Sequence, residues 1–406
     1  MAISVKKLVG ATLLWAAANA TLAQPLTLDS ALQTAFANNP DLAAAQWEID
    51  IAAGGRRQAG LIPNPVVSWD AEDTRRESRT TTVKLSQTLE LGGKRSARID
   101  VATRGQGAAA LTLDQRRNTL RTEVIDSYYA ALRAQERLDL AQRSLALAER
   151  GLGVANGRVS AGKSSPVEAT RAQVQLSQIR LELNRAQIGL ADAYRRLAAS
   201  TGNAAADFDA VATPSQSTPA LPPAAQLLAR LGQTAELRLA ELHIQQSEAN
   251  VSLEKTQRIP DLDVSIGSQY DATVRERVNL VGVSMPIPLF NRNQGNVLAA
   301  TRRADQARDL RNAAELRLRT ETRQALDLWH AANTEVRAFN QQILPAAQSA
   351  VDAATRGFEM GKFNFLDVLD AQRTLIAART QYLTATAQAT DAWLRIERIY
   401  GDLARF

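Results

Sequence analysis

The sequence predicts a mainly α-helical protein with a small β part, built by internal duplication of one long unit. Residues 26–202 are repeated, imperfectly, at 221–401. In each copy, two short alternating segments precede a long stretch with a heptad pattern. Aromatic residues make up only 5% of the 406 residues, which favours long helices packed through small side chains over a compact globular core.

The duplication is clearest near the end of each heptad stretch. Residues 162–173, GKSSPVEATRAQ, align with residues 361–372, GKFNFLDVLDAQ. Two copies of one supersecondary unit suggest pseudo-symmetry of the kind found in closed rings. The expected boundaries are a first repeat at 24–202, a Pro-rich linker at 203–224 and a second repeat at 225–406.

Residues 1–23 have the pattern of a secretory signal peptide. Lys6 and Lys7 precede a short apolar run at 8–18, and small residues suited to cleavage follow. The run is too short to span a bilayer. We expect an exported, cleaved chain; a retained N-terminal helix is the alternative. The chain contains no cysteine, so we expect no disulfide, no thiolate metal site and no lipid on an N-terminal cysteine.

Each repeat is expected to open with a helix and a pair of strands. The first helix runs from Leu28 to about Gly60, with an interruption at 38–40, and Asp29 or Ser30 is its expected cap. The expected strands are 66–70 and 81–91 in the first repeat, and 262–266 and 278–287 in the second.

The third expected strand, residues 262–266, has an alternating apolar and polar pattern that bears on the role of the strands. Leu262, Val264 and Ile266 alternate with polar neighbours, which gives one apolar and one polar face. A lipid-facing strand of a membrane β-barrel requires this pattern, and a small soluble hairpin packed on the helices is the alternative. Four strands cannot close a barrel alone, so several protomers would have to share one.

Long helices should follow the strands. No proline occurs from about Arg95 to Ser160, and some 65 residues of helix extend roughly 100 Å. An Ala-rich heptad seam lets such helices approach closely, and Pro345 is expected to kink the second copy. The seam positions are Val124, Ala131, Leu138, Leu145 and Leu152 with Ser127, Ala134, Ala141, Ala148 and Ala155, and in the second copy Trp329, Val336, Ile343 and Ala350 with Ala332, Phe339, Ala346 and Ala353.

Each long helix should end in a tight turn, at Gly162 and at Gly361, followed by an antiparallel return helix at about 166–201 or 365–400. Pro166 suits a first helical position after a serine cap. Residues 157–164 match the phosphate-loop pattern, but a heptad helix precedes them, whereas that motif requires a strand. We therefore interpret them as a hairpin tip.

Other classes of site find little support. His243 and His330 are the only histidines, and they do not stand at a ligand spacing, so we expect no metal site, no cofactor and no catalytic constellation. The net charge of +6 is spread along the chain without a basic patch, which argues against nucleic-acid binding.

The starts of the return helices carry charges that suit a pore mouth. Asp367 and Asp370 stand one turn apart on one helix face, and Glu168 and Arg171 occupy the equivalent places in the first repeat. In a ring of protomers such carboxylates favour cations. The alternative is a solvated helix start, where acidic side chains offset the helix dipole.

Several motifs in order resemble the TolC family of outer-membrane efflux channels, over essentially the whole mature chain. The sequence around residues 89–95 and 286–295 is most similar to that of the heavy-metal, cobalt-zinc-cadmium branch. The motifs are residues 28–32 with 38–40, residues 87–95 (QTLELGGKR), residues 286–295 (PIPLFNRNQG) and the two tips.

The resemblance implies a homotrimer in the outer membrane, with twelve strands in a shared barrel and a helical tunnel in the periplasm. It further implies a periplasmic adaptor at the hairpin tips and a proton-driven pump in the inner membrane. A duct for drugs or for type I protein secretion stays open, as does a periplasmic structural or adaptor coiled coil. The adaptor-contacting residues would be Gly162, Lys163, Ser164, Gly361, Lys362 and Phe363.

Overall fold

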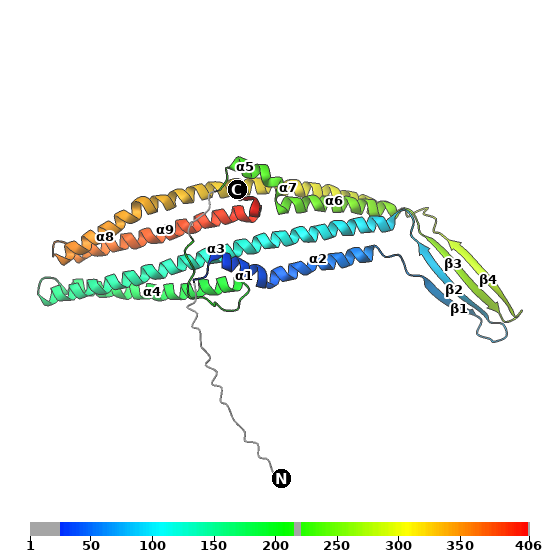
Figure 1. Ribbon diagram of the computed structural model, residues 1–406, viewed down its shortest axis with the longest axis horizontal. Coiled ribbons are helices and arrows are strands. Elements are labelled where there is room, and N and C mark those ends of the chain that lie inside the picture. Colours follow the sequence, from blue (N-terminus) through cyan, green and yellow to red (C-terminus); the bar gives the residue numbers. More distant parts are fainter. Residues whose placement is uncertain (1–24, 215–220, 405–406) are drawn as a thin grey trace, which may run out of the picture.

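The chain folds into a long helical rod with a four-stranded sheet bent away from one end (Figure 1). The computed structural model describes residues 25–214 and 221–404, so the expected signal peptide at 1–23 lies outside them. The helices are α1 (Leu28–Asn38), α2 (Pro40–Ala59), α3 (Lys94–Ser160), α4 (Pro166–Ser200), α5 (Ala224–Arg230), α6 (Ala235–Thr256), α7 (Gln294–Ala338), α8 (Leu344–Glu359) and α9 (Phe365–Tyr400). The short turns are η1 (Leu231–Gln233), η2 (Phe339–Ile343) and η3 (Gly401–Ala404).

The sheet joins the two halves of the chain. Its strands are β1 (Val66–Glu72), β2 (Thr80–Leu89), β3 (Leu262–Asp271) and β4 (Glu276–Ser284). They pair in the order β1-β2-β3-β4, each pair antiparallel, so that a hairpin from each half meets the other through β2 and β3. Strands β1 and β4 are therefore the edges of the sheet.

The helix starts follow local capping rules. Thr27, rather than the expected Asp29 or Ser30, caps α1, because its hydroxyl accepts a hydrogen bond from the Ser30 backbone N–H at 3.2 Å. The expected interruption is confirmed at Asn39. Its side chain accepts from the backbone N–H groups of Asp41 and Leu42, and so caps α2.

In the first half, α3 and α4 form a long antiparallel hairpin, as the heptad pattern predicted. Much of the expected seam is buried, and its alanines let the two helices approach closely. The buried seam residues are Val124, Ala131, Ala141, Ala148 and Ala155.

In the second half, the expected seam is wrong by one residue beyond Phe339. The buried residues of α8 include Ala347, Val351 and Ala354, each one position after the expected Ala346, Ala350 and Ala353. The cause is η2, a π-helical turn just before Pro345. A π-turn holds one residue more than an α-turn, so it rotates the following helix and brings a neighbouring row of side chains inward.

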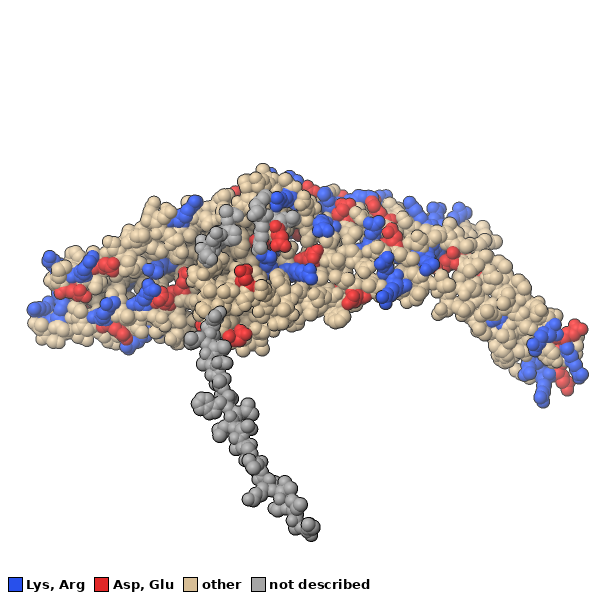
Figure 2. Space-filling model, in the orientation of Figure 1, with Lys and Arg blue, Asp and Glu red and all other residues tan. Residues whose placement is uncertain are grey.

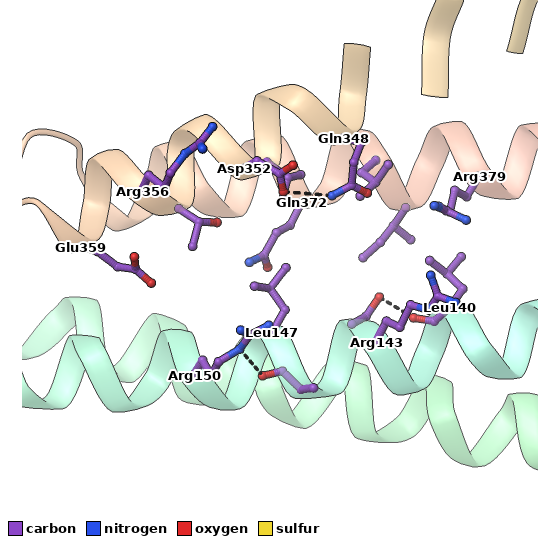
Figure 3. Close-up of a pocket in the computed structure, with 16 residues that line it drawn as sticks. Leu140, Arg143, Leu147, Arg150, Gln348, Asp352, Arg356, Glu359, Gln372 and Arg379 are labelled. Atoms are coloured by element: carbon purple, nitrogen blue, oxygen red, sulfur yellow. Dashed lines mark hydrogen bonds between the residues drawn. The ribbon is translucent and has the colours of Figure 1, made fainter. Parts of the chain in front are cut away.

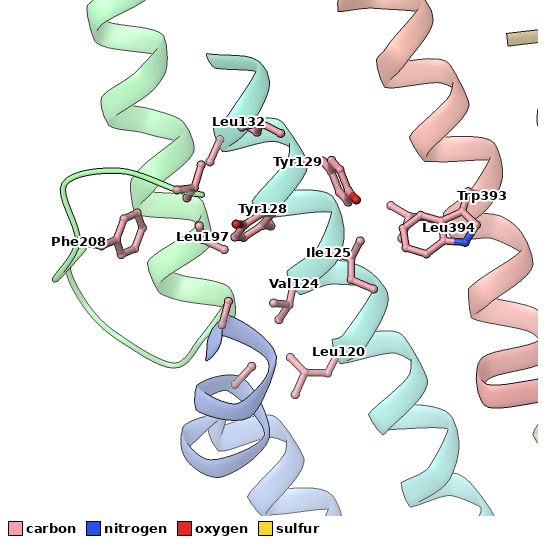
Figure 4. Close-up of a cluster of buried hydrophobic side chains, with 14 of the residues drawn as sticks. Leu120, Val124, Ile125, Tyr128, Tyr129, Leu132, Leu197, Phe208, Trp393 and Leu394 are labelled. Carbon is pink, nitrogen blue, oxygen red and sulfur yellow. The ribbon is translucent and has the colours of Figure 1, made fainter. Parts of the chain in front are cut away.

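The largest core cluster lies at the middle of the rod, where α1, α3, α4 and α9 meet (Figure 4). Tyr129 of α3 stacks edge-to-face on Trp393 of α9, with ring centroids 6.3 Å apart. Aromatic side chains thus pack where several helices converge, and a second aromatic pair, Phe358 and Phe365, packs near the hairpin tips.

The expected linker also packs onto this core. Phe208 and Val211 are buried, and Leu26 forms a parallel bridge with Val211. The Tyr128 hydroxyl lies 2.9 Å from the Leu26 carbonyl oxygen and 2.6 Å from that of Ala212. Burial raises the pKa of Tyr128 to about 12, so its hydroxyl stays neutral and can donate a hydrogen bond to these carbonyl oxygens. Residues 203–214 therefore anchor the N-terminal strand segment to α3.

Within the described ranges, no helix carries an apolar stretch long enough to cross a bilayer.

Gly202, which directly follows the C-cap of α4 and has a φ of +85°, allows the packing of this region to be tested. A Cβ atom there would lie 2.7 Å from the Asn38 backbone oxygen. We expect Gly202→Ala to lower the free energy of unfolding by about 2 kcal/mol or more, since strain and a clash combine. Thermal unfolding followed by circular dichroism measures this. Gly162→Ala is the matched control, because its φ of +67° is similar but its Cβ would meet nothing within 4 Å. Equal losses in the two variants would contradict the proposed clash.

Candidate functional site

Both hairpin tips end in the same backbone turn. Gly162 and Gly361 have φ values of +67° and +74°, as the αL position of a helix C-terminus requires. The Lys163 N–H donates to the Arg158 carbonyl and the Lys362 N–H donates to that of Gly357, each at 2.8 Å. The interpretation of residues 157–164 as a hairpin tip is confirmed, because Gly157 lies inside α3.

The return helices begin with capping residues that use two of the four expected pore-mouth side chains. Ser165 caps α4, and the Glu168 carboxylate accepts a hydrogen bond from the Ser164 hydroxyl at 2.5 Å. Asn364 and Asp367 form a capping box at the start of α9, with the Asn364 N–H donating to the Asp367 carboxylate at 2.9 Å. These two acids stabilise their own helix starts.

The tips leave a groove between α4 and α9. It has a volume of about 630 Å³, and Arg171, Asp367 and Asp370 line it together with Arg373. Glu168 is not among the lining residues. Asp367 and Asp370 do share a face, as their spacing predicted, but their role as a ring at a pore mouth stays a prediction.

One contact that joins the two tips was not predicted from the sequence. The Arg158 guanidinium of α3 lies 5.0 Å from the centre of the Phe358 ring of α8, and its Nη1 donates to the Phe358 carbonyl at 3.3 Å. Phe358 also packs on Phe365 in a buried cluster shared by both hairpins. A lone arginine near a helix end gives no sequence signal for such a contact.

Phe363, expected at the adaptor surface, lies over a glycine. A Cβ atom on Gly357 would overlap the Phe363 ring. The ring remains about half exposed, at 47%. The second tip therefore presents an aromatic side chain outward where the first tip presents Ser164.

A second groove, of about 700 Å³, is lined by residues of α3, α8 and α9 (Figure 3). Arg143 and Arg150 come from α3, Arg356 and Glu359 from α8, and Arg379 from α9. Leu147 points into the groove from α3. The groove thus has an apolar floor and a mainly basic rim.

At the other end of the rod, the strand register sorts the sheet into two faces. Directly paired residues lie on the same face. Two rows on one face are largely apolar and lie open to the surroundings; Val281, for example, is 79% exposed. These rows are Val67, Leu85, Ile266 and Val281, and Trp69, Val83, Ser268 and Asn279.

The opposite face is mostly polar. Its rows include Asp70, Thr82, Gln269 and Val278, and Ser68, Lys84, Gly267 and Leu280. Figure 2 shows charged side chains gathered at the far end of the sheet, with few between them and the helices. The alternation expected for one strand therefore extends across the sheet, and its apolar face is uncovered in the single chain.

Ion pairs fix the junction between sheet and helices. Buried Lys94, the first residue of α3, contacts Asp261 at 2.7 Å, and the Leu91 N–H donates to the same carboxylate. Arg98 binds Glu90, and this hydrogen bond lowers the pKa of the Glu90 carboxyl below its usual value. The sheet is therefore held at a set angle to α3.

In the part of the chain that the structure describes, no group of three or more His, Asp or Glu side chains is arranged to hold a metal ion. His243 lies on α6 and His330 on α7.

Comparison with known proteins decides the family. The model of the outer membrane efflux protein family matches residues 31–203 and again residues 229–402. The chain belongs to the outer membrane efflux protein family. It is 40% identical to the cobalt-zinc-cadmium resistance protein CzcC of Cupriavidus metallidurans, over 93% of this chain and 91% of that protein.

Solved structures of membrane proteins share the fold. CusC superposes with a TM-score of 0.77 at 20% identity, covering 93% of this chain and 94% of that one. The outer membrane protein VceC of Vibrio cholerae superposes with a TM-score of 0.75 at 20% identity, covering 91% and 95%. These superpositions show that the fold is shared, and the family match makes this chain an outer membrane efflux protein.

The contact between the tips of the efflux protein generates a prediction. Arg158→Ala removes the interaction with the Phe358 ring and one hydrogen bond, so we expect a loss of about 1–2 kcal/mol in stability. Thermal unfolding, together with protease sensitivity at the tips, measures it. Arg143→Ala on the same helix is the control, because its exposed pair with Asp139 is worth about 0.5 kcal/mol. An unchanged protease pattern in Arg158→Ala would show that the contact does not join the tips.

Proposed function

We propose that three copies of this chain form a passive duct through the outer membrane, which carries heavy-metal cations delivered by a proton-driven inner-membrane pump and a periplasmic adaptor. The observation that carries the proposal is the uncovered amphipathic sheet with two free edges. Transport in this proposal needs no chemistry on the cargo and no bound cofactor; the chain supplies a water-filled path.

The sheet supports the shared barrel through its edges. Unpaired backbone groups on β1 and β4 would pair with the neighbouring copies, since an open strand edge in lipid leaves costly unsatisfied N–H and C=O groups. Three sheets of four strands give twelve strands. The apolar rows would then face lipid and the polar rows the lumen, which is the arrangement of outer-membrane barrels.

The hairpins support a periplasmic tunnel with its adaptor at the tips. They lie at the end of the rod farthest from the sheet (Figure 1), where a partner from the periplasm would meet them. We assign adaptor contact to the two turns, at residues 162–164 and 361–363. Among the acids at the tips, Asp370 is the candidate for the pore mouth, because Glu168 and Asp367 already bind their own helix starts.

The cargo is assigned from the relative at 40% identity, whose name states resistance to cobalt, zinc and cadmium. A duct for drugs or secreted protein is the second candidate within the same architecture. A soluble periplasmic coiled-coil protein is not favoured, since its sheet would expose the apolar rows to water.

The lipid-facing assignment makes a directional prediction. Leu85→Arg places a charge on the apolar face, at a cost of about 2–4 kcal/mol near the middle of a bilayer. We expect the variant to be lost from the outer-membrane fraction and to lack a heat-modifiable gel band. Thr82→Arg, on the polar face of the same strand, should assemble normally. Assembly of both variants would refute the assignment of faces.

The tip assignment and the cargo are tested together in a strain that lacks this gene. We expect the wild-type chain to restore growth on cobalt, zinc and cadmium, and Gly361→Val to fail at least tenfold in tolerated concentration, because a β-branched residue resists a φ of +74°. Gly153→Val is the control, as Gly153 is exposed with nothing within 4 Å of a Cβ atom. Both variants should reach the outer membrane. If the wild-type chain restored growth on drugs but not on metals, the cargo would be drugs, as in the second candidate function.

A further inference from the structure

The distal rim of the sheet is the end farthest from the helices, formed by the loops 73–79 and 272–275 and the strand residues beside them. Charged side chains gather there (Figure 2). The register places acids of the rim on the polar face of the sheet, in one row of directly paired residues: Glu72, Thr80, Asp271 and Glu276. The polar face of the rim is therefore acidic.

The apolar face of the distal rim carries arginine instead. Tyr270 of β3 is paired with Arg277 of β4, and the alternation along the strands places both on the apolar face. Arg79 belongs to the same face, because the Ala272 N–H donates to the Arg79 carbonyl at 3.0 Å and so continues the β2–β3 ladder one pair beyond Thr80. Both arginines are exposed. The register thus separates the two signs of charge, one on each face.

Neither arginine has an acidic partner in the part of the chain that the structure describes. The Asp73 carboxylate of the nearby loop binds Arg75 and the Ser78 hydroxyl, each at 2.7 Å. The acids of the neighbouring row lie on the opposite face, because successive residues of a strand project to opposite sides. Among the described residues, Arg79 and Arg277 form no ion pair. Their charges are therefore not neutralised within that part of the chain.

The arginines stand at one boundary of the apolar face. From the Leu89–Leu262 pair, next to the helices, to the pair that contains Tyr270, this face extends eight residues, or roughly 26 Å along the strand. The apolar band of an outer-membrane barrel is about 25 Å tall and is bounded by aromatic side chains. Tyr270 is 38% exposed at the end of this band. Arg277 lies on one side of it, on β4, and Arg79 on the other, at the start of β2.

We propose that Arg79, Tyr270 and Arg277 bind the phosphorylated headgroup of an anionic lipid in the outer leaflet, with the acyl chains on the apolar rows. The inference rests on the proposed duct, which turns this face toward lipid, and it names the class of lipid that the face selects. A guanidinium group binds phosphate through two parallel hydrogen bonds and is more weakly hydrated than an ammonium group, so it suits a boundary between lipid and water. Tyrosine suits the same boundary, because its ring is apolar and its hydroxyl polar.

The spacing of the arginines favours a headgroup with two phosphates. Arg79 and Arg277 belong to strands that are separated by β3, and Arg79 lies two residues farther out, so their backbones are roughly 12 Å apart. Two phosphates on one headgroup give each guanidinium its own anion. The occupant is a lipid rather than a free phosphate ion, because the same face continues into Ile266 and Val281, which an ion would leave uncovered.

Titration of bisphosphorylated lipid A into the detergent-purified full-length protein, followed by native mass spectrometry, tests the site. We expect the double variant Arg79→Gln with Arg277→Gln to bind at least tenfold more weakly, since each arginine at an anionic lipid surface contributes about fivefold. The wild-type chain should bind monophosphorylated lipid A about fivefold more weakly than the bisphosphorylated form. Arg75→Gln with Lys84→Gln is the matched control. It removes the same charge from an ion pair and from the polar face, and should change binding less than twofold.

The outcomes separate this inference from the proposed function. Equal losses in the two double variants, or displacement of the lipid by inorganic phosphate at the same concentration, would overturn the lipid site. Membrane insertion is measured in parallel by the heat-modifiable gel band, and export by growth on metals. If the wild-type chain inserts and exports metal but the Arg79 and Arg277 variant binds lipid A as tightly as the wild type, the site is wrong while the duct stands. A wild-type chain that neither inserts nor binds lipid would overturn both.

Discussion

The four-stranded sheet imposes the constraint on which the rest of the structure depends. Strand pairing leaves β1 and β4 as open edges, and the register gathers apolar side chains on one uncovered face. Such a sheet is costly in water, both for its unpaired backbone groups and for its exposed apolar area. A single chain therefore leaves these groups without partners. Pairing between copies in a membrane would provide hydrogen-bond partners for the strand edges and an apolar environment for the exposed face.

The helices must stay in contact side by side over a great length, with little space between them for large side chains. Small seam residues such as Ala141 and Ala148 allow close approach, and large aromatic rings pack at the centre, where Tyr129 meets Trp393, and near the tips, where Phe358 meets Phe365. The π-turn at Phe339–Ile343 shifts the buried row of α8 by one residue, so that Ala347 and Val351 face the core in place of Ala346 and Ala350.

Local hydrogen bonding limits what the acidic residues at the tips can do. Glu168 and Asp367 hydrogen-bond at their own helix starts, and Asp367 lines the groove between α4 and α9 together with Asp370 and Arg171. A count of acidic residues along the sequence therefore overstates the number of carboxylates that are free of local hydrogen bonds. The Arg158 contact with Phe358 shows the converse, because a side chain without a motif joins the two hairpins.

The sequence by itself determined the long hairpins, their turns at Gly162 and Gly361, and the strand pairs, because heptad spacing, period-two alternation and glycine at αL act over short distances. It also determined the family through its motifs. Only the tertiary structure decided the cap at Thr27, the packing of Phe208 and Val211, and the rotation of α8. The burial of Phe208 and Val211 is decided by residues far away along the chain, whereas the cap and the rotation of α8 depend on which of several local hydrogen-bonding patterns forms.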